Sequence, residues 1–128
     1  MNILIITSSP NTDGLTAACG NAAKVGVEMG SALANIISLN TLNIPACHAC
    51  GSGWGTCLKE HTCQVKDDFQ ALHEKMAKAD GYIIITPTYW GDMSESLKSF
   101  IDRLRRCEAS NGDKNSLFGK PFICVAAP

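Results

Sequence analysis

The sequence predicts an α/β domain built around an open, doubly wound sheet of parallel strands. Two observations lead to this prediction. The strongest apolar runs are short and unbroken, without the alternation of a half-buried strand, which is typical of strands covered on both faces. Segments with helical periodicity lie between these runs, so strands and helices alternate along the chain.

Four segments are expected to form the strands. They are residues 3–6, 36–39, 82–85 and 122–126, of which the second gives the weakest signal. No linker, repeat or low-complexity tract divides the chain, so we expect its 128 residues to form one domain around one core.

Three helices are expected between the strands. The apolar stripe of the first is Leu15, Ala18, Cys19, Ala22, Val25 and Met29. The stripe of the second is Phe69, Leu72, Met76 and Ala79, and that of the third is Leu97, Phe100, Ile101 and Leu104. Two glycines within the first helix, Gly20 and Gly26, suggest close packing against the sheet.

The two later helices begin with residues typical of a capping box. Asp67 precedes Gln70 by three residues, and Asp92 precedes Glu95 by the same interval. On the second helix, His73 lies off the apolar stripe and is expected to face solvent.

Composition and charge exclude some classes of partner. The formal net charge is -1, so nothing indicates binding to nucleic acid or to an anionic membrane surface. No apolar run approaches the ~20 residues of a membrane helix, and the first residues lack the basic region of a signal peptide. We therefore expect a cytoplasmic protein with no membrane and no nucleic-acid partner.

The seven cysteines are an odd number in a chain without a secretory signal, so a disulfide framework is not expected. Cys19 and Cys124 lie within apolar patterns and are expected to be small core residues. Four others gather in one predicted loop, at Cys47, Cys50, Cys57 and Cys63. Four thiolates can bind a metal, but free thiols are the favoured interpretation because the spacing is irregular for zinc.

Ligands of open α/β sheets bind beyond the carboxyl ends of the strands, so the segments after the strands carry the candidate site. After residues 3–6 comes TSSPNTDGLT, a loop rich in hydroxyl groups that leads into a helix N-terminus. Free amide groups and the helix dipole suit a phosphate there. An ordinary turn with helix caps explains the same composition equally well, and the pattern is neither a Walker loop nor GxGxxG.

After the third run comes PTYWGDMS, residues 87–94, which places two aromatic residues at a loop tip. Tyr89 and Trp90 are candidates to line a planar ligand, with Gly91 allowing a close backbone approach. The alternatives are that they cover the top of the core or lie in a dimer interface. This stretch alone does not separate the three.

Together the two loops resemble those of the flavodoxin-like NAD(P)H-dependent FMN reductases. SSPNTDGLT resembles the phosphate loop of that family, usually GSPRxxGNT, although Asn11 and Leu15 stand where the family often has a basic residue and an asparagine. PTYWGDMSESLKSFIDRL resembles the flavin-ring loop and the following helix, usually SPVYxGxxSxxLKxFIDR. The resemblance covers nearly the whole chain, and it implies a flavodoxin-like sheet with strand order 2-1-3-4 and FMN as cofactor.

The resemblance also implies which residues hold FMN. The phosphate would lie on Ser9, Asn11, Gly14, Leu15 and Thr16. The ring would lie against Pro87, Thr88, Tyr89, Trp90 and Gly91, with Ser94 nearby and Ala127 in the third flavin loop. FMN would take hydride from NAD(P)H and pass electrons to a small-molecule acceptor, so no catalytic side chain is expected. A homo-oligomer is expected, because a partner subunit would help to cover the aromatic residues.

The cysteine loop resembles that of the iron-sulfur flavoproteins, which carry a 4Fe–4S cluster. Residues 51–56 lengthen the second gap between its cysteines. A cluster, or a zinc site that includes His48 or His61, therefore remains an alternative to free thiols. Two rivals to an FMN reductase follow: an electron-transfer flavoprotein that uses such a cluster, and a flavodoxin-like module without flavin.

A flavodoxin-like sheet has five strands, whereas only four are found in this sequence. Residues 122–126 are unbroken in their apolar character, as in an inner strand, and carry no charge that would protect a free edge. We therefore expect the natural protein to continue past Pro128 with at least one more strand and helix. In the 128-residue form, FMN should bind weakly or be absent, and the chain should associate along its fourth strand.

Overall fold

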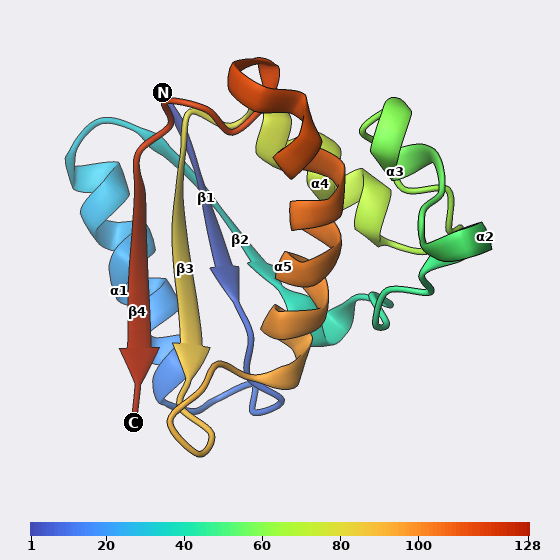
Figure 1. Cartoon of the computed structure of the whole chain (residues 1–128). Coiled ribbons are helices and arrows are strands. Elements are labelled where there is room, and N and C mark those ends of the chain that lie inside the picture. The colour runs from blue at the N-terminus through green and yellow to red at the C-terminus, as the bar shows by residue number, and fades with distance from the viewer.

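A parallel sheet of four strands, in the order β2-β1-β3-β4, forms the centre of the computed structural model, which describes residues 1–128 (Figure 1). The strands are β1 (Asn2–Thr7), β2 (Leu33–Ser38), β3 (Gly81–Pro87) and β4 (Phe122–Ala127). The predicted fold class and strand order are confirmed. β2 begins earlier than expected, and Leu39 belongs to the turn that follows it.

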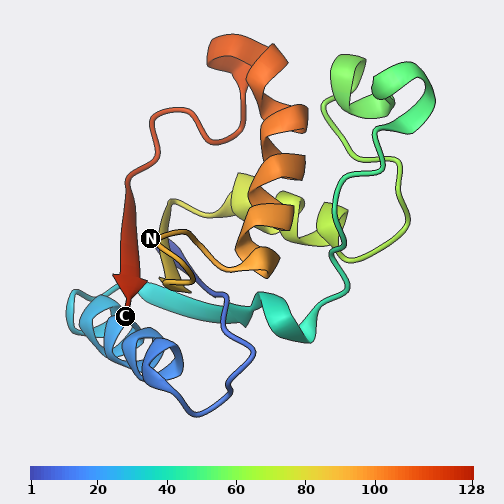
Figure 2. The same ribbon diagram turned by 60° about the horizontal axis from the view of Figure 1, so that its bottom comes forward.

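One helix covers one face of the sheet and two helices cover the other. The helices are α1 (Leu15–Met29), α2 (Cys50–Gly53), α3 (Thr56–Lys59), α4 (Phe69–Lys78) and α5 (Glu95–Glu108), with 3₁₀ turns η1 (Leu39–Thr41) and η2 (Ala109–Lys114). α1 lies on one face, and α4 and α5 lie on the opposite face (Figure 2). Right-handed crossovers produce this arrangement, because the chain moves from β1 to β2 in one direction and then returns past β1 to β3 and β4 in the other. None of these helices has the length and apolar character needed to cross a bilayer.

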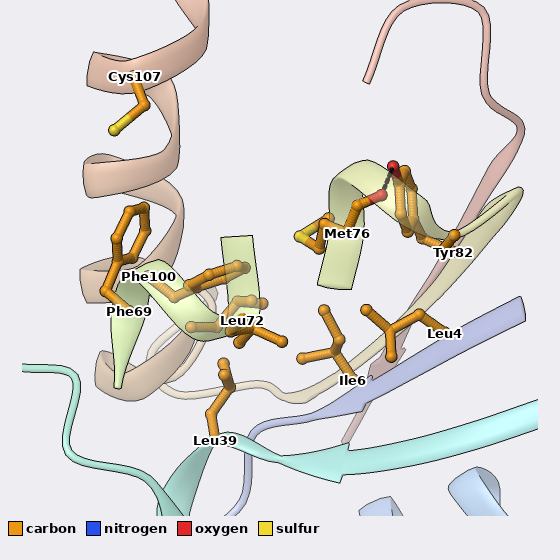
Figure 3. Close-up of a cluster of buried hydrophobic side chains, with 11 residues drawn as sticks. Leu4, Ile6, Leu39, Phe69, Leu72, Met76, Tyr82, Phe100 and Cys107 are labelled. Carbon is orange, nitrogen blue, oxygen red and sulfur yellow. Dashed lines mark hydrogen bonds between the residues drawn. The ribbon is translucent and has the colours of Figure 1, made fainter. Parts of the chain in front are cut away.

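The main core lies between the sheet and the pair α4 and α5 (Figure 3). Its buried residues are Leu4, Ile6, Leu39, Phe69, Leu72, Met76, Ala79, Tyr82, Leu97, Phe100 and Cys107. The apolar stripes predicted for the second and third helices both face this core, so these two predictions are confirmed. The Tyr82 hydroxyl donates a hydrogen bond to the Met76 carbonyl at 2.7 Å, which satisfies its polar end inside the core.

The apolar stripe predicted for α1 is wrong, because it points away from the sheet. Leu15, Val25 and Met29 are exposed, and Met29 keeps 82% of its surface accessible. The buried residues of α1 are instead the small Thr16 and Gly20. The helix therefore contacts the sheet through a face that carries little hydrophobic signal.

Gly20 allows this close contact. A Cβ atom at Gly20 would lie 3.0 Å from Cγ2 of Thr7 on β1, which is tighter than ordinary van der Waals contact. Gly26 has no neighbour within 4 Å of the same position. Close packing against the sheet thus explains the first glycine but not the second.

Neither predicted capping box forms. At α4, Gln70 is turned away from the box, because its Oε1 accepts a hydrogen bond from the amide of Cys63 at 2.9 Å. At α5 the N-cap is Ser94 and not Asp92, since Ser94 Oγ accepts a hydrogen bond from the Leu97 amide at 3.4 Å. The side chain of Gln70 forms a tertiary contact instead, and the spacing of residues within the helix does not reveal such contacts.

His73 is buried, so the prediction that it faces solvent is wrong. Its Nε2 lies 2.5 Å from Glu108 Oε1, and Ser116 donates to the same carboxylate from its N–H at 3.0 Å and its hydroxyl at 2.5 Å. Burial alone would raise the pKa of Glu108, but the hydrogen bonds from Ser116 and His73 outweigh it and hold that pKa below its ordinary value. These contacts join α4, α5 and the loop before β4.

β4 pairs with β3 along one edge and leaves its other edge free. Phe122 and Ile123 are exposed as a result. Cys124 is exposed too, which corrects its expected place in the core, and Cys19 is only half-buried on α1. Both predictions rest on apolar neighbours, and several of these neighbours, such as Ile123 and Ala18, are themselves exposed.

Candidate functional site

The carboxyl ends of β1, β3 and β4 lie at one end of the sheet, so the segments that follow them are neighbours (Figure 1). Backbone hydrogen bonds join these segments. The Ser8 amide donates to the Ile85 carbonyl at 3.1 Å, and the Thr88 amide donates to the Ala127 carbonyl at 2.8 Å. Ala127 and Pro87 are buried at this point, where the three segments meet.

The loop after β1 leads to a helix N-terminus that no side chain caps. Gly14 is the N-cap residue, so the amide groups of the first turn of α1 are available to an anion. Ser9 is half-buried, and its Oγ accepts a hydrogen bond from the amide of the exposed Asn11 at 3.2 Å. Leu15 is exposed and Thr16 is buried. The loop holds no lysine or arginine, so its donors are amide and hydroxyl groups.

Trp90 and Gly91 form a tight turn at the tip of the loop after β3. Tyr89 and Asp92 on either side exchange backbone hydrogen bonds of 2.8 and 3.0 Å. A two-residue turn of this kind needs positive φ at both central positions, and Trp90 and Gly91 have φ of 52° and 76°. This conformation is strained for tryptophan and leaves its side chain fully exposed, next to the exposed Thr88. Trp90 therefore does not cover the core. Its exposed side chain is free to contact a ligand or a partner subunit.

A cleft of about 430 Å³ lies among the segment after β2, the start of α5, and one residue from each of the loops after β1 and β3. It is lined by Pro10, Asn40, Ile44, Pro45, Ala46, Tyr89, Ser94, Glu95, Ser96 and Ser99. Small-molecule pockets measure roughly 300–1,000 Å³, so the size is suitable. Residues 44–46 form a wall that sequence reasoning missed. They lie beyond the end of β2, so the rule that ligands bind after the strands would have found them.

Hydrogen bonds fix the polar residues around this cleft. Ser96 Oγ donates to Asn40 Oδ1 at 3.0 Å, which links α5 to η1. Ser94 is buried, and its amide donates to Thr86 Oγ1 at 3.0 Å while its hydroxyl caps α5. Ser94 thus lines the cleft, but its hydroxyl is used to cap α5.

Five cysteines line a second, much smaller cavity beside α5. They are Cys47, Cys50, Cys57, Cys63 and, from α5 itself, Cys107. The cavity measures about 20 Å³, little more than one water molecule needs, and no three side chains of metal-binding type converge on one point. Burial, with the thiols of Cys63 and Cys57 nearby, raises the pKa of Cys107 to about 12, so this thiol stays protonated at neutral pH.

A buried ion pair lies next to the cysteine cavity. Arg103 of α5 contacts both carboxylate oxygens of Asp67, at 2.8 and 3.0 Å. Burial alone would raise the pKa of Asp67, but hydrogen bonds from Arg103 and from the Phe69 amide outweigh it and hold that pKa below its ordinary value. Sequence reasoning missed this pair, although an arginine between the apolar positions of the α5 stripe was a usable signal.

Known proteins share both the sequence pattern and the fold. An iron-sulfur flavoprotein of Archaeoglobus fulgidus is 36% identical over 115 residues, which are 87% of this chain and 52% of that protein. The chain spans about half the length of the curated relatives it matches. These relatives are named iron-sulfur flavoproteins.

Two solved structures superimpose over 98% of the chain. The NAD(P)H:quinone oxidoreductase from Methanothermobacter marburgensis gives a TM-score of 0.76 at 19% identity and is covered over 64% of its length. RosB, solved with 8-demethyl-8-formylriboflavin-5'-phosphate, gives 0.80 at 17% identity and is covered over 51%. These likenesses show the flavodoxin-like fold. Since the model of the NADPH-dependent FMN reductases also matches residues 1–128 throughout, the chain belongs to that family.

Proposed function

We propose that this chain is the FMN-binding domain of an oxidoreductase that transfers hydride from NAD(P)H, through bound FMN, to a small-molecule acceptor. Membership of the family supports the cofactor and the reductant. The observation that carries the proposal is geometric. An uncapped helix N-terminus and an exposed aromatic turn lie at the same end of the sheet, and a cleft of ligand size there is bordered by Pro10 and Tyr89 of these two loops.

The loop after β1 fits the phosphate of FMN. The amides at the start of α1 carry the positive end of the helix dipole, which compensates for the missing basic side chain. We propose that Ser9, Asn11, Gly14, Leu15 and Thr16 bind this group. Leu15 and Thr16 would use their backbone amides, because one side chain is apolar and the other is buried.

The turn after β3 fits the flavin ring. We propose that the ring contacts the residues 87–91, next to Ser94 and Ala127. Bound FMN accepts the hydride and supplies the redox chemistry. The chain's own side chains orient the ring and limit water. Apart from Tyr89 and Glu95, no titratable side chain lines the cleft, so placement is the main contribution of the protein.

Flavin binding and turnover test this proposal together. FMN added to the purified chain should lose fluorescence as it binds, and the complex should oxidise NADH or NADPH in the presence of an artificial electron acceptor. The comparison of the two nucleotides gives the preference for one of them. A protein that FMN neither binds nor stabilises against urea would instead be a flavodoxin-like module without flavin.

An electron-transfer role through an iron-sulfur cluster is the second candidate. The names of the curated relatives, iron-sulfur flavoproteins, favour it, and five cysteines lie near one another beside α5, although the cavity that they line is small. Protein prepared without oxygen should then contain iron and acid-labile sulfide, and Cys50→Ser should abolish both. Colourless, iron-free protein from the same preparation would reject this role.

We also propose a cytoplasmic homodimer. The seven cysteines are free, which suits a reducing compartment, and a partner subunit placed over Trp90 would cover its exposed ring. Sedimentation with and without FMN would measure the association. If Trp90→Ala leaves the oligomer and the FMN affinity unchanged, Trp90 contacts neither the partner nor the ring.

β4 is the subject of a separate proposal, that a further strand completes the sheet beside it. Its free, uncharged edge and the exposed Phe122 and Ile123 support this. The 128-residue chain should self-associate along that edge and bind FMN weakly. In ultracentrifugation, Ile123→Lys should shift the chain towards monomer, whereas Met29→Lys on the exposed face of α1 should not. A wild-type monomer that binds FMN tightly would contradict the proposal.

A further inference from the structure

The cysteine cavity does not fit the cluster that the relatives suggest. A 4Fe–4S cluster is a cube of four irons and four sulfides that four thiolates hold. The cavity is about 20 Å³ in volume, and no three potential ligands converge on a single point. Cys63 Sγ already accepts a hydrogen bond from Arg103 Nη2 at 3.2 Å. The Cys63 thiol is therefore bound by α5, and the space that the thiols border is far smaller than a cluster.

Arg103 lies at the centre of the contacts that hold this loop. Its side chain is 2% exposed and binds the carboxylate of Asp67 through both of its terminal nitrogens. Nη1 also donates to the Pro45 carbonyl at 3.1 Å, and Nη2 donates to Cys63. One guanidinium group thus fastens both ends of the loop, at residues 45 and 63, to α5 and to the start of α4.

Two neighbouring contacts extend the same attachment. Asp68 Oδ2 accepts a hydrogen bond from the Asn43 amide at 2.6 Å, which ties the segment just before the loop. At the tip of the loop, Arg106 donates to the Gly53 carbonyl, and its guanidinium lies 4.0 Å from the centre of the Trp54 ring. Side chains of α5 and the residues just before α4 therefore attach the loop at its beginning, tip and end.

The segment that Arg103 holds is also a wall of the candidate FMN cleft. Ile44, Pro45 and Ala46 line that cleft, and the Pro45 carbonyl is the atom that accepts from Arg103. We propose that Arg103 is a positioning residue, which sets this wall and holds the cysteine loop through hydrogen bonds instead of a metal ion. The effect on FMN rests on the proposed function, whereas the effect on the loop does not.

The test compares Arg103→Lys with Arg105→Lys, an exposed position on the same helix. Lysine keeps the charge but cannot form the bidentate pair. Hydrogen–deuterium exchange should rise in peptides that cover residues 43–50 of Arg103→Lys, while exchange in β1 and β3 stays as in wild type. The dissociation constant of FMN should rise about tenfold. Arg105→Lys should change neither quantity.

The metal is tested on wild-type protein prepared without oxygen. Iron and zinc should be well below one per chain, and a chelator should leave the exchange of residues 43–50 unchanged. A stoichiometric metal whose removal loosens this segment would overturn the proposal.

Exchange alone also decides the role of the arginine. Unchanged exchange in Arg103→Lys, or a uniform rise across the whole domain, would overturn it, since the second result marks a purely structural residue. If Arg103→Lys does not fold, Asp67→Asn weakens the same pair and should loosen the same segment. If wild-type protein fails to bind FMN, the proposed function fails, and the exchange result still decides whether Arg103 positions the wall.

Discussion

The two faces of the sheet are covered in different ways. On one face, α4 and α5 bury large side chains such as Phe69 and Phe100 against the strands. On the other, α1 touches the sheet through Thr16 and Gly20 and leaves its larger apolar residues exposed. Periodicity therefore identifies a helix on either face, but it identifies the buried side only where large residues make the contact.

The difference also separates stability from assembly. The α4 and α5 face contains the large hydrophobic core, the buried ion pair of Arg103 and the hydrogen-bonded Glu108, so it should determine how stable the domain is. The exposed side of α1 and the free edge of β4 contribute little to stability and leave apolar surface for a partner. Substitutions on the two faces should accordingly give very different results.

The largest contrast is expected between Phe100→Ala and Met29→Ala. Phe100 is completely buried, so its truncation should lower the free energy of unfolding by about 3–5 kcal/mol. Met29 is exposed, and its truncation should change that free energy by less than about 0.5 kcal/mol. Urea unfolding followed by circular dichroism measures both. Comparable losses in the two variants would show that α1 is packed through its predicted stripe after all.

Acid should weaken the same face of the domain. The pKa values of Asp67 and Glu108 lie below their ordinary 3.8 and 4.5, so these carboxylates stabilise the folded state above that range. The stabilisation should be lost as pH falls through the lowered pKa values, where the folded state also binds the protons. Both carboxylates should contribute to this loss, because the pKa of each is lowered in the folded state. Urea unfolding between pH 6 and about 2.5 measures it, and Glu108→Gln should reduce its slope.

The two glycines of α1 provide a smaller and more exact comparison. Gly26→Ala should stabilise the protein by about 0.5–1 kcal/mol, because alanine favours a helix and the new methyl group meets no neighbour. Gly20→Ala should gain less or be destabilising, since its methyl group would lie 3.0 Å from Thr7 Cγ2. Thermal unfolding of both variants checks this. An equal gain at both positions would mean that α1 can move away from β1 without cost.

Several features were predictable from sequence because they depend on neighbouring residues alone. The unbroken runs of β1 and β3 identified a parallel sheet, and the spacing of Phe69, Leu72 and Met76 identified the buried side of α4. The turn at Trp90 was found from its sequence, which has aromatic residues where a strand ends.

Other features depend on contacts between distant segments, and local patterns do not contain them. His73 is buried because its Nε2 forms a hydrogen bond with the carboxylate of Glu108, which lies 35 residues further along the chain and also accepts hydrogen bonds from Ser116. Arg103 faces Asp67 and Pro45 for the same reason. The cleft wall at residues 44–46 was missed although its place after β2 was predictable, because only the loops after the first and third strands carried a recognisable motif.

The central claim, that the loop after β1 binds the FMN phosphate, is tested most directly by a matched pair of isosteric substitutions. Asn11→Asp adds a negative charge to an exposed position of the loop after β1, and Asn21→Asp adds the same charge to an exposed position further along α1. FMN affinity is measured by quenching of flavin fluorescence at low ionic strength, where charge effects are largest. Asn11→Asp should weaken binding about tenfold, and Asn21→Asp should leave it within about twofold of wild type. Equal affinities for wild type and both variants would contradict the claim, because the phosphate would then lie elsewhere.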